Sequence, residues 1–522
     1  MTCTALPALA AIAISAFAQV HDSDGSNDQP QQPPPTEESA CMSRAADAFN
    51  ITLQFKWPRK TCMRLNGGFA SIPGSFAGLA FSTGNLLHLG ETLSLSSQFG
   101  MRLRRLQFGF DRPSLFGKPI QTGFTIYGQR FNYNQGRESS IFAFQRDIPL
   151  FSQARPEDLL NYVSHAYGGT VFAQYPVRGT FSRLSVTYSY DVSDIKPLTR
   201  STGEYFGYLD FQSAGGSNTL NGIRTSKLTP AFTYNTVDHP ISPTRGTALS
   251  ISMAVAGLGG NVNTIEPAIE AKHFLAGIKR GHVIGVHLFG RLLTGYGGHL
   301  APPFNRYYMG GENDVRGFDS WSIGPITYMP SSATVNVLNL DGSPRIQKII
   351  VNGMQVFVNV TQMIPVFRLV SPGGDTNVAA NFEYRIPIAR PLTLALFTDA
   401  GVNRLSFPGQ LRLNPDRIDL LNAQFPQAAF SGRLIIPPGT QKIRMSTGAE
   451  LQVRVPRMNA PLRFYGAYNP IVYRGNPGAP PPFDRSLFPN DLTYLNALQT
   501  VGAPTPFRER HFTFRFSIGR TF

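Results

Sequence analysis

One guanidinium and two carboxylates are the residues of this sequence whose types could act together. Arg316 lies in a glycine-rich segment, directly before Gly317. Glu383 and Asp399 each occupy the polar side of a segment in which polar and apolar residues alternate. An arginine can bind a carboxylate through two parallel hydrogen bonds, which would hold the arginine's segment in place. Considered alone, the residues favour a simpler interpretation, in which Arg316 is hydrated and both carboxylates line a wet surface.

Motifs of covalent chemistry are missing from the sequence. It contains no G-x-S-x-G turn of a serine hydrolase, no H-E-x-x-H pair of a zinc enzyme and no phosphate-binding P-loop. The Asp399-Ala400-Gly401 segment resembles one half of an aspartic protease site, but the second half is missing. Neither Cys41 nor Cys62 has a second cysteine or a histidine nearby at metal-ligand spacing. We therefore expect no enzyme activity, no metal site and no cofactor.

The segments that carry these residues are the elements that must position them, and each alternates over about ten residues. In the last segment Phe512, Phe514 and Phe516 share one parity, and Thr513 and Arg515 share the other. A β-strand places such sets on opposite faces. The expected strands span residues 67–72, 76–83, 91–99, 102–110, 119–132, 165–177, 181–191, 225–236, 246–256, 263–276, 282–297, 376–387, 391–403, 444–456, 460–469 and 510–522.

Alternation fits a soluble sandwich as well as a membrane barrel, so other features must decide between them. The chain begins with an apolar leader, it ends in an aromatic residue on an alternating strand, and short turns alternate with long connections. All three are typical of bacterial outer-membrane barrels, which also need an even number of strands. The predicted fold class is therefore all-β, a 16-stranded antiparallel transmembrane β-barrel with long external loops, in the bacterial cell outer membrane.

Four connections are too long to be simple turns, and loops of that length are usually functional or disordered. The longest carries Arg316 and also an apolar run, residues 348–370, that fits no expected element. Residues 155–166 (RPEDLLNYVSHA) predict a short helix. The four connections span residues 133–164, about 298–375, 404–442 and 470–509, the last two rich in proline.

The charge composition of the chain indicates which kinds of partner it could bind. The chain has 522 residues and a formal net charge of +15, and only 15% of its residues are charged. Residues 19–40 carry five acidic and no basic residues, so the rest of the chain carries about +20. The basic residues are scattered, without the clustered face or motif of a nucleic-acid-binding protein. We expect outer-membrane lipid as a partner, and no nucleic acid.

The N-terminal residues read as a leader and a linker. Residues 1–18 contain an apolar stretch that ends in an A-x-A site, as in a signal peptide, although no basic residue precedes it. Residues 19–66 are expected to form a disordered linker and a short N-terminal segment, and residues 67–522 the barrel. Cys3 would leave with the leader. Cys41 and Cys62 would then remain as an even pair that could form a disulfide.

Ordered motifs in the C-terminal half carry a family resemblance. RYYMGGENDVRGFDSWSIGP (306–325) closely resembles the sixth external loop of the BamA-like outer-membrane protein assembly family, also called the bacterial surface antigen family. NFEYRIP (381–387), LALFTDAG (394–401) and NAPLRFYGAYNP (459–470) resemble the strands that follow it. RFSIGRTF (515–522) resembles the family's last strand. The matches keep family order over about residues 67–522. TYNTVDHPISPTRGTALSISM (233–253) resembles an earlier strand-turn-strand of the family.

The resemblance implies roles for particular residues. In the family, the arginine of VRGF enters the barrel and contacts two carboxylates, which implies a pinned loop here. The last strand carries an outer-membrane targeting signal, which would use Phe516, Gly519 and Phe522. First and last strands pair weakly and open sideways, which implies a lateral gate at Gly67, Gly68 and Gly519. The expected loop-pinning residues are Arg316, Gly317, Phe318, Glu383 and Asp399.

The implied function is a barrel that inserts or translocates outer-membrane proteins through this lateral gate. Unfolded outer-membrane protein clients and assembly lipoproteins are the implied partners. Family members carry POTRA domains of about eighty residues before the barrel, and residues 19–66 are too few for one. Two alternatives remain open at this point. One is a passive pore or a two-partner-type secretion channel, and the other is a surface antigen whose loops bind partners.

Overall fold

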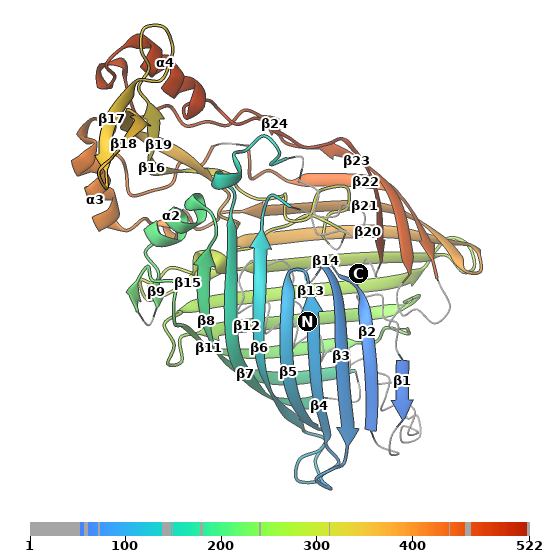
Figure 1. The fold of residues 1–522 in the computed structure, drawn as a ribbon. Helices are drawn as coiled ribbons and strands as arrows, with labels where there is room; N and C mark the ends of the chain where they lie inside the picture. The colour runs from blue at the N-terminus through green and yellow to red at the C-terminus, as the bar shows by residue number, and fades with distance from the viewer. Residues whose placement is uncertain are drawn as a thin grey trace.

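The computed structural model describes residues 53–56, 61–70, 74–137, 148, 150–177, 181–213, 215–239, 242–312, 314–437, 439–454 and 461–518. Its main sheet contains 18 strand segments, which curve into a barrel wall (Figure 1). Two of the segments are minor: β1 (Leu53–Lys56), at the edge of the sheet, and the two-residue β15 (Thr294–Gly295), which pairs with β13. The other segments are the sixteen antiparallel strands expected from the alternation.

Each wall strand pairs with the next wall strand in chain order, and all these pairs are antiparallel, across short turns as well as long connections. The wall consists of β2 (Thr61–Ala70), β3 (Gly74–Gly84), β4 (Thr92–Gly100), β5 (Leu103–Arg112), β6 (Gln121–Asn134), β7 (Asn161–Val177), β8 (Ser182–Pro197), β11 (Ile223–Asn235), β12 (Gly246–Ala256), β13 (Thr264–Ala276), β14 (Val283–Leu292), β20 (Thr376–Ala389), β21 (Leu392–Arg404), β22 (Arg444–Val453), β23 (Leu462–Ile471) and β26 (Phe512–Ile518).

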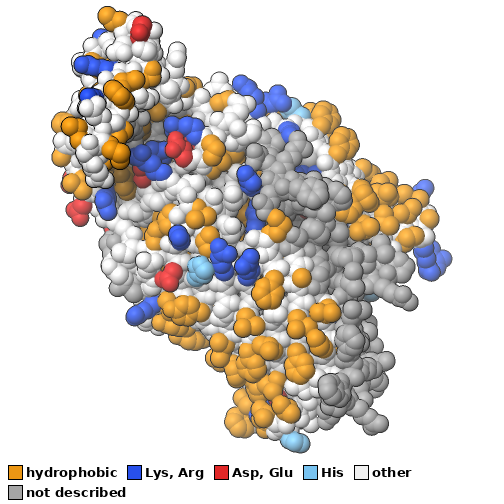
Figure 2. Space-filling view, in the orientation of Figure 1, with side chains coloured by type: hydrophobic (Ala, Val, Ile, Leu, Met, Phe, Trp, Pro, Cys, Tyr) orange, Lys and Arg blue, Asp and Glu red, His pale blue; other side chains and the backbone are white. Residues whose placement is uncertain are grey.

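The two faces of the wall differ in polarity, as the alternation predicts. On β6, Phe124 and Ile126 are exposed on the outer face, whereas Thr125 and Gln129 are buried on the inner face. Figure 2 shows apolar side chains spread over the outer wall. An apolar outer face and a polar lumen are the arrangement of a membrane barrel, in which the outer face contacts lipid. None of the helices in the described part of the chain is long or apolar enough to cross a bilayer.

Long connections gather at one end of the barrel and form a cap (Figure 1). The cap contains α2 (Arg200–Tyr208), α3 (Pro415–Gln424) and α4 (Asp491–Thr500). Apolar residues from several loops, among them Phe206, Phe304 and Leu421, share one buried cluster. Because the loops bury apolar side chains against one another, the cap is a packed layer over the barrel mouth.

The apolar run at 348–370, which fitted no expected element, lies in strands of the cap. β16 (Thr327–Asn336) pairs with β19 (Thr361–Val370), and between them β17 (Ile346–Val351) pairs with β18 (Met354–Asn359). β16 and β19 pack against α4 through a buried cluster that includes Ile364 and Phe488. Smaller strands and 3-10 turns complete the loops: β9 (Gln212–Ser213), β10 (Gly216–Ser217), β24 (Arg474–Gly475), β25 (Phe507–Arg508), Pro156–Asp158, Pro303–Asn305, Pro408–Leu411, Pro426–Ala428 and Arg485–Leu487.

Two expectations about boundaries were wrong. The expected helix at 155–166 is only a 3-10 turn at Pro156–Asp158, and β7 begins at Asn161, because its first residues pair with β6 and β8. The first wall strand begins at Thr61 rather than at residue 67, and β1 lies within the expected linker. Cys62 and Arg64 are buried while Met63 and Leu65 are exposed, so the strand alternation already operates there. The expected leader, residues 1–18, lies outside the described residues.

Candidate functional site

The long loop between β15 and β16 enters the barrel and places Arg316 against the wall. Arg316 is fully buried. Its Nε donates to Asp399 Oδ2 at 2.7 Å and its Nη2 donates to Asp399 Oδ1 at 2.9 Å. The backbone N–H of Arg316 also donates to Asp399 Oδ2, at 3.0 Å. This bidentate, charge-assisted arrangement fixes both the side chain and the backbone of the loop.

Two glutamates complete the surroundings of the guanidinium. Nη1 of Arg316 lies 3.4 Å from Glu450 Oε2 and 3.6 Å from Glu383 Oε1. The guanidinium carbon lies 3.7 Å from the centre of the Phe397 ring, within the range of a cation–π contact. Burial alone would lower the pKa of Arg316, but Asp399 and the two glutamates hold that pKa above its ordinary value. The guanidinium therefore stays charged inside the barrel.

The charges around Arg316 are balanced by two further arginines. Arg463 donates to both carboxylate oxygens of Glu450, from Nε to Oε1 at 2.8 Å and from Nη2 to Oε2 at 2.7 Å. Arg385 donates to Glu383 at 2.8 Å. Three cations thus face three carboxylates, with Gln452 donating to both glutamates. A buried ionic cluster needs such pairing, because an unpaired buried charge costs several kcal/mol, on the order of 3–5.

Strand register explains why these side chains meet. Asn381 lies opposite Asp399, and Asp399 lies opposite Ser446, in one row across β20, β21 and β22. All three side chains are buried on the lumenal face. Neighbouring positions of the same parity bring Glu383 and Glu450 beside this row. The wall therefore presents a rigid set of carboxylates, and the loop brings the cation to it.

Gly317 sits where the loop passes closest to the wall. Its φ is +87°, a conformation that other residues rarely adopt. A Cβ at this position would lie 2.3 Å from Asn469 Oδ1. Its carbonyl oxygen accepts hydrogen bonds from Asn469 Nδ2 at 2.9 Å and from Thr513 Oγ1 at 2.8 Å. The next residue, Phe318, is buried in an apolar cluster formed mostly by the loop itself.

The same loop also binds the last wall strand. Thr513 and Arg515 both lie on the lumenal side of β26. Arg515 donates to Asp319 and lies 3.8 Å from Glu312 through its other terminal nitrogen. The loop therefore joins β26 to the wall strands β20–β23 through side-chain contacts, in addition to the backbone ladder between β23 and β26.

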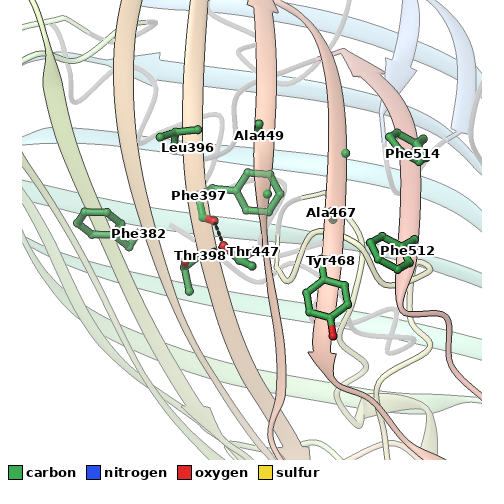
Figure 3. Close-up of a pocket in the computed structure, with 12 residues that line it drawn as sticks. Phe382, Leu396, Phe397, Thr398, Thr447, Ala449, Ala467, Tyr468, Phe512 and Phe514 are labelled. Carbon is green, nitrogen blue, oxygen red and sulfur yellow. Dashed lines mark hydrogen bonds between the residues drawn. The ribbon is translucent and has the colours of Figure 1, made fainter.

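Outside the wall, the strands next to the seam form a shallow apolar hollow of about 600 Å³ (Figure 3). Ala449 lies between Phe382 on one side of the hollow and Phe514 on the other (Figure 3), and Gly466 also lines the hollow. Phe514 is 84% exposed, which suits a lipid-facing position on the last strand. The hollow and the ionic cluster thus occupy opposite faces of the same strands.

The structure brings some of the predicted site residues together and leaves others apart. Arg316, Glu383 and Asp399 meet as described, and Gly317 and Phe318 lie beside them. Gly67 and Gly68 lie well inside β2, opposite Ala77 and Phe76 of β3, and do not begin the strand as expected.

Three further predictions concern residues of which the structure describes only some. Phe516 lies on β26 with its ring 4.7 Å from that of Phe464, whereas Gly519 and Phe522 lie outside the described residues. Cys62 is buried in β2, and Cys41 also lies outside them, so the disulfide stays a prediction. In the part of the chain that the structure describes, no group of three potential metal ligands is found.

Sequence reasoning missed Glu450, Arg463, Asn469, Thr513 and Arg515 as parts of the site. Because polar and apolar residues alternate on their strands, Glu450, Thr513 and Arg515 were placed on the polar face. That pattern could not show which polar residues the loop would reach, because the position of a loop inside a barrel depends on its tertiary contacts.

Comparisons with known proteins agree with this geometry. Residues 85–522 match the Omp85 superfamily domain. The outer membrane protein assembly factor BamA of Neorickettsia risticii is 22% identical over 281 residues, 53% of this chain and 33% of the relative. The sorting and assembly machinery component 50 homolog B of Xenopus laevis is 31% identical over 101 residues, 19% of this chain and 21% of the relative. This chain thus spans a third or less of either curated relative.

A solved structure shows the same fold. The crystal structure of BamA from Haemophilus ducreyi lacking POTRA domains 1–3 superposes with a TM-score of 0.54 at 18% identity, covering 79% of this chain and 67% of that one. The family match extends over most of the sequence and includes the loop and every strand of the ionic cluster. The chain described here is therefore an outer-membrane β-barrel and belongs to the Omp85 superfamily.

Proposed function

We propose that this chain is the barrel of a BamA-like assembly factor, which inserts or translocates outer-membrane proteins through a lateral gate between its first and last wall strands. The observation that carries the proposal is the state of the seam. Among the described residues, no ladder joins β26 to β1 or β2, although every wall strand from β3 to β23 pairs with both of its wall neighbours. Family membership and the BamA relatives supply the class of activity.

The loop that carries Arg316 would hold β26, one of the two strands of this gate, in place. Arg316 ties the loop to β20–β22, and Thr513 and Arg515 tie β26 to the loop. Within the described residues, side chains hold β26 on its lumenal face and the β23 ladder holds one of its edges, and in this mechanism a client strand would pair with the other edge. Unpaired strand edges are templates for adding another strand, which is the step that insertion of a β-barrel client requires.

The proposed partners follow from the location and the activity. Outer-membrane lipid would contact the apolar outer wall, including the hollow beside β26. Unfolded outer-membrane proteins would be the clients, and assembly lipoproteins would be accessory partners. Client insertion in this mechanism makes and breaks hydrogen bonds only, so the proposal includes no covalent step and no cofactor.

A cross-linked seam tests the gate. Cysteines at Met63 on β2 and Phe514 on β26 would be joined by a bifunctional maleimide, in a chain whose native cysteines are replaced by serine. We expect client insertion into liposomes to fall severalfold. Cysteines at Leu79 and Ser97, register partners on β3 and β4, provide a matched control within the closed wall. Unchanged insertion with a fully linked seam would refute the gate, and steady conductance without insertion would favour the passive pore.

A further inference from the structure

Arg306 is a buried arginine of the cap that has no carboxylate partner. It follows the 3-10 turn Pro303–Asn305, and its side chain is fully buried. Its Nη2 donates to the carbonyl oxygen of Gln410 at 2.5 Å. In the part of the chain that the structure describes, no carboxylate pairs with its guanidinium, and no group accepts a hydrogen bond from Nε or Nη1. Arg316 and Arg463, which are buried to a similar degree, each bind a carboxylate at 2.7 Å.

The positive charge of Arg306 therefore needs a partner that the described residues do not supply. A guanidinium does not lose its proton in a protein, so burial cannot neutralise it. A buried charge that is left unpaired strongly destabilises a fold. The carbonyl oxygen of Gln410 satisfies one N–H group, but it carries no net charge.

The side chains beside Arg306 are neutral and aromatic. Burial raises the pKa of Tyr205 and of Tyr308, and the charge of Arg306 opposes both rises, so the guanidinium lies near both hydroxyls. The Tyr308 hydroxyl donates to the carbonyl oxygen of Ser371 at 2.9 Å. The Tyr205 hydroxyl has no hydrogen-bond partner among the described groups, and the side chain is fully buried. Arg306 and Tyr205 thus present donors without an acceptor.

The carboxylates of the adjoining segments are already bound. Glu204, the neighbour of Tyr205 in the sequence, accepts a hydrogen bond from Arg368 at 3.0 Å. Asp375 accepts two backbone N–H bonds, at 2.7 and 2.8 Å. These carboxylates have partners of their own, which leaves the charge of Arg306 to an anion from solution.

Arg306 lies where three of the long connections meet. It belongs to the connection after β15, its acceptor Gln410 to the connection after β21, and Tyr205 to α2 between β8 and β9. The backbone at this point is fixed, because Tyr307 exchanges two hydrogen bonds with Gly374, both at 2.8 Å. An anion bound to Arg306 and Tyr205 would hold these connections together.

We propose that Arg306 and Tyr205 bind a monovalent inorganic anion of the size of chloride inside the cap. Guanidinium N–H and phenol O–H groups are both hydrogen-bond donors, and one anion can accept from all of them. A single negative charge neutralises one guanidinium, whereas a divalent anion would leave a buried negative charge. Both side chains are fully buried, which favours a small ion over an organic acid. The anion would stabilise the cap, and this inference does not depend on the proposed gate.

Refolding at matched ionic strength tests the site. The full chain is refolded into phosphatidylcholine liposomes in sodium chloride or in sodium gluconate, and the rate of protease cleavage of the cap is measured. We expect severalfold slower cleavage in chloride, with a protection that saturates as chloride rises. In Arg306→Gln the two salts should give equal rates. Equal rates in the unaltered chain, or a chloride effect that persists in Arg306→Gln, would overturn the proposal.

Two further variants separate this site from a general effect of salt. Arg412→Gln is the matched control, since Arg412 is a cap arginine that already binds a carboxylate, Asp210, at 3.0 Å. It should keep the full chloride effect, and loss of the effect there would contradict a specific site. Tyr205→Phe keeps the ring but removes one donor, so the chloride concentration for half-maximal protection should rise severalfold. An unchanged concentration would contradict the shared site.

Bromide detects the anion without any variant. It has the charge of chloride and scatters X-rays anomalously, so crystals of the full chain grown in sodium bromide should show an anomalous peak beside Nε and Nη1 of Arg306. An ordered guanidinium that binds water there, without an anomalous peak, would overturn the proposal. Neither measurement uses client insertion, so failure of the lateral gate would leave the anion site standing.

Discussion

The two sides of the seam are held by different chemistry. On one side, the loop contacts β26 through Thr513 and Arg515 and is itself anchored by Arg316. On the other side, the part of the chain that the structure describes contains a ladder of four residue pairs between β1 and β2. The connections differ as well, since only residues 71–73 separate β2 from β3, whereas residues 472–511 precede β26. Among the described residues, side-chain contacts are thus seen on the β26 side of the seam and a backbone ladder on the β2 side.

This difference suits the proposed gate, which would have to accept many strands. Side-chain networks are specific, because each donor and each charge needs its own partner. Backbone ladders tolerate almost any sequence, since every residue other than proline offers the same groups. In the proposed gate, pairing through backbone groups would let one barrel pair with clients of varied sequence. The predictions below remove the side-chain contacts stepwise, starting from the contact with the largest expected effect.

Arg316→Ala should have the largest effect, because it leaves both oxygens of buried Asp399 without the guanidinium that binds them. Breaking a buried pair in this way costs about 3–5 kcal/mol. We expect the loop to leave the wall and β26 to lose its lumenal contacts. Protease cleavage of the loop in intact membranes and the temperature of barrel unfolding would measure the change.

The control for this variant lies further along the same long connection, between β16 and β17. Arg345→Ala removes an exposed arginine near the β17–β18 hairpin and should leave loop cleavage unchanged. Equal cleavage rates in the two variants would contradict the anchor. A weaker effect of Arg316→Lys than of Arg316→Ala is expected, although lysine cannot reproduce the bidentate geometry.

Gly317→Ala should have the next largest effect. The substitution forces a side chain into the left-handed region, which costs about 1–2 kcal/mol, and also places a Cβ against Asn469. Gly342→Ala is a matched control, since Gly342 has a similar φ of +82° but nothing within 4 Å of a Cβ. The difference between the two variants in loop protection isolates the contact with the wall. No difference between them would mean that the close approach of Gly317 is unimportant.

The sequence predicted the wall far better than the cap. Alternation identified sixteen strands because a barrel strand has one lipid-facing and one lumenal side, and this pattern is local. It failed at Thr61–Asn66, where charged and polar residues near Pro58 resemble a linker. The apolar run at 348–370 was not placed, although β18 pairs locally with β17 and β19 pairs with the nearby β16; only its packing partner α4 lies far away in sequence.

The candidate site divides in the same way. Glu383 and Asp399 were identified as lumenal from parity, and their link to Arg316 came from the family resemblance. Thr513 and Arg515 were also placed on the polar face of the last strand. Their contact with residues 317–319 depends on how deeply the loop enters the barrel, and no local pattern encodes that depth.

Arg515→Ala should have a smaller effect, and one confined to the seam. It removes the contacts with Asp319 and Glu312 but leaves the Arg316 cluster intact. Hydrogen bonds to charged groups contribute about 1.5–3 kcal/mol, and this arginine is slightly exposed, so we expect the lower end of that range. Amide exchange on β26 should accelerate while exchange on β21 stays constant. Phe514→Ala, which alters the lipid-facing side, should not accelerate exchange, and equal acceleration in both variants would contradict a lumenal anchor.

The smallest expected effect is a pH dependence of loop docking. Asp314 lies in the loop, outside the wall strands, where burial raises its pKa to about 6 against the opposing influence of Arg291 and the Gly310 backbone. Because the docked loop holds this proton more tightly than a released loop would, docking is strongest below the ordinary pKa of 3.8 and weakens as pH rises through about 6. Loop cleavage should therefore be slower at about pH 4.5 than at about pH 7.5, and Asp314→Asn should reduce that difference. If the Asp314→Asn variant showed the same pH dependence of loop cleavage, another titratable group would be responsible for it. The Asp314 carboxyl would then contribute nothing to loop docking.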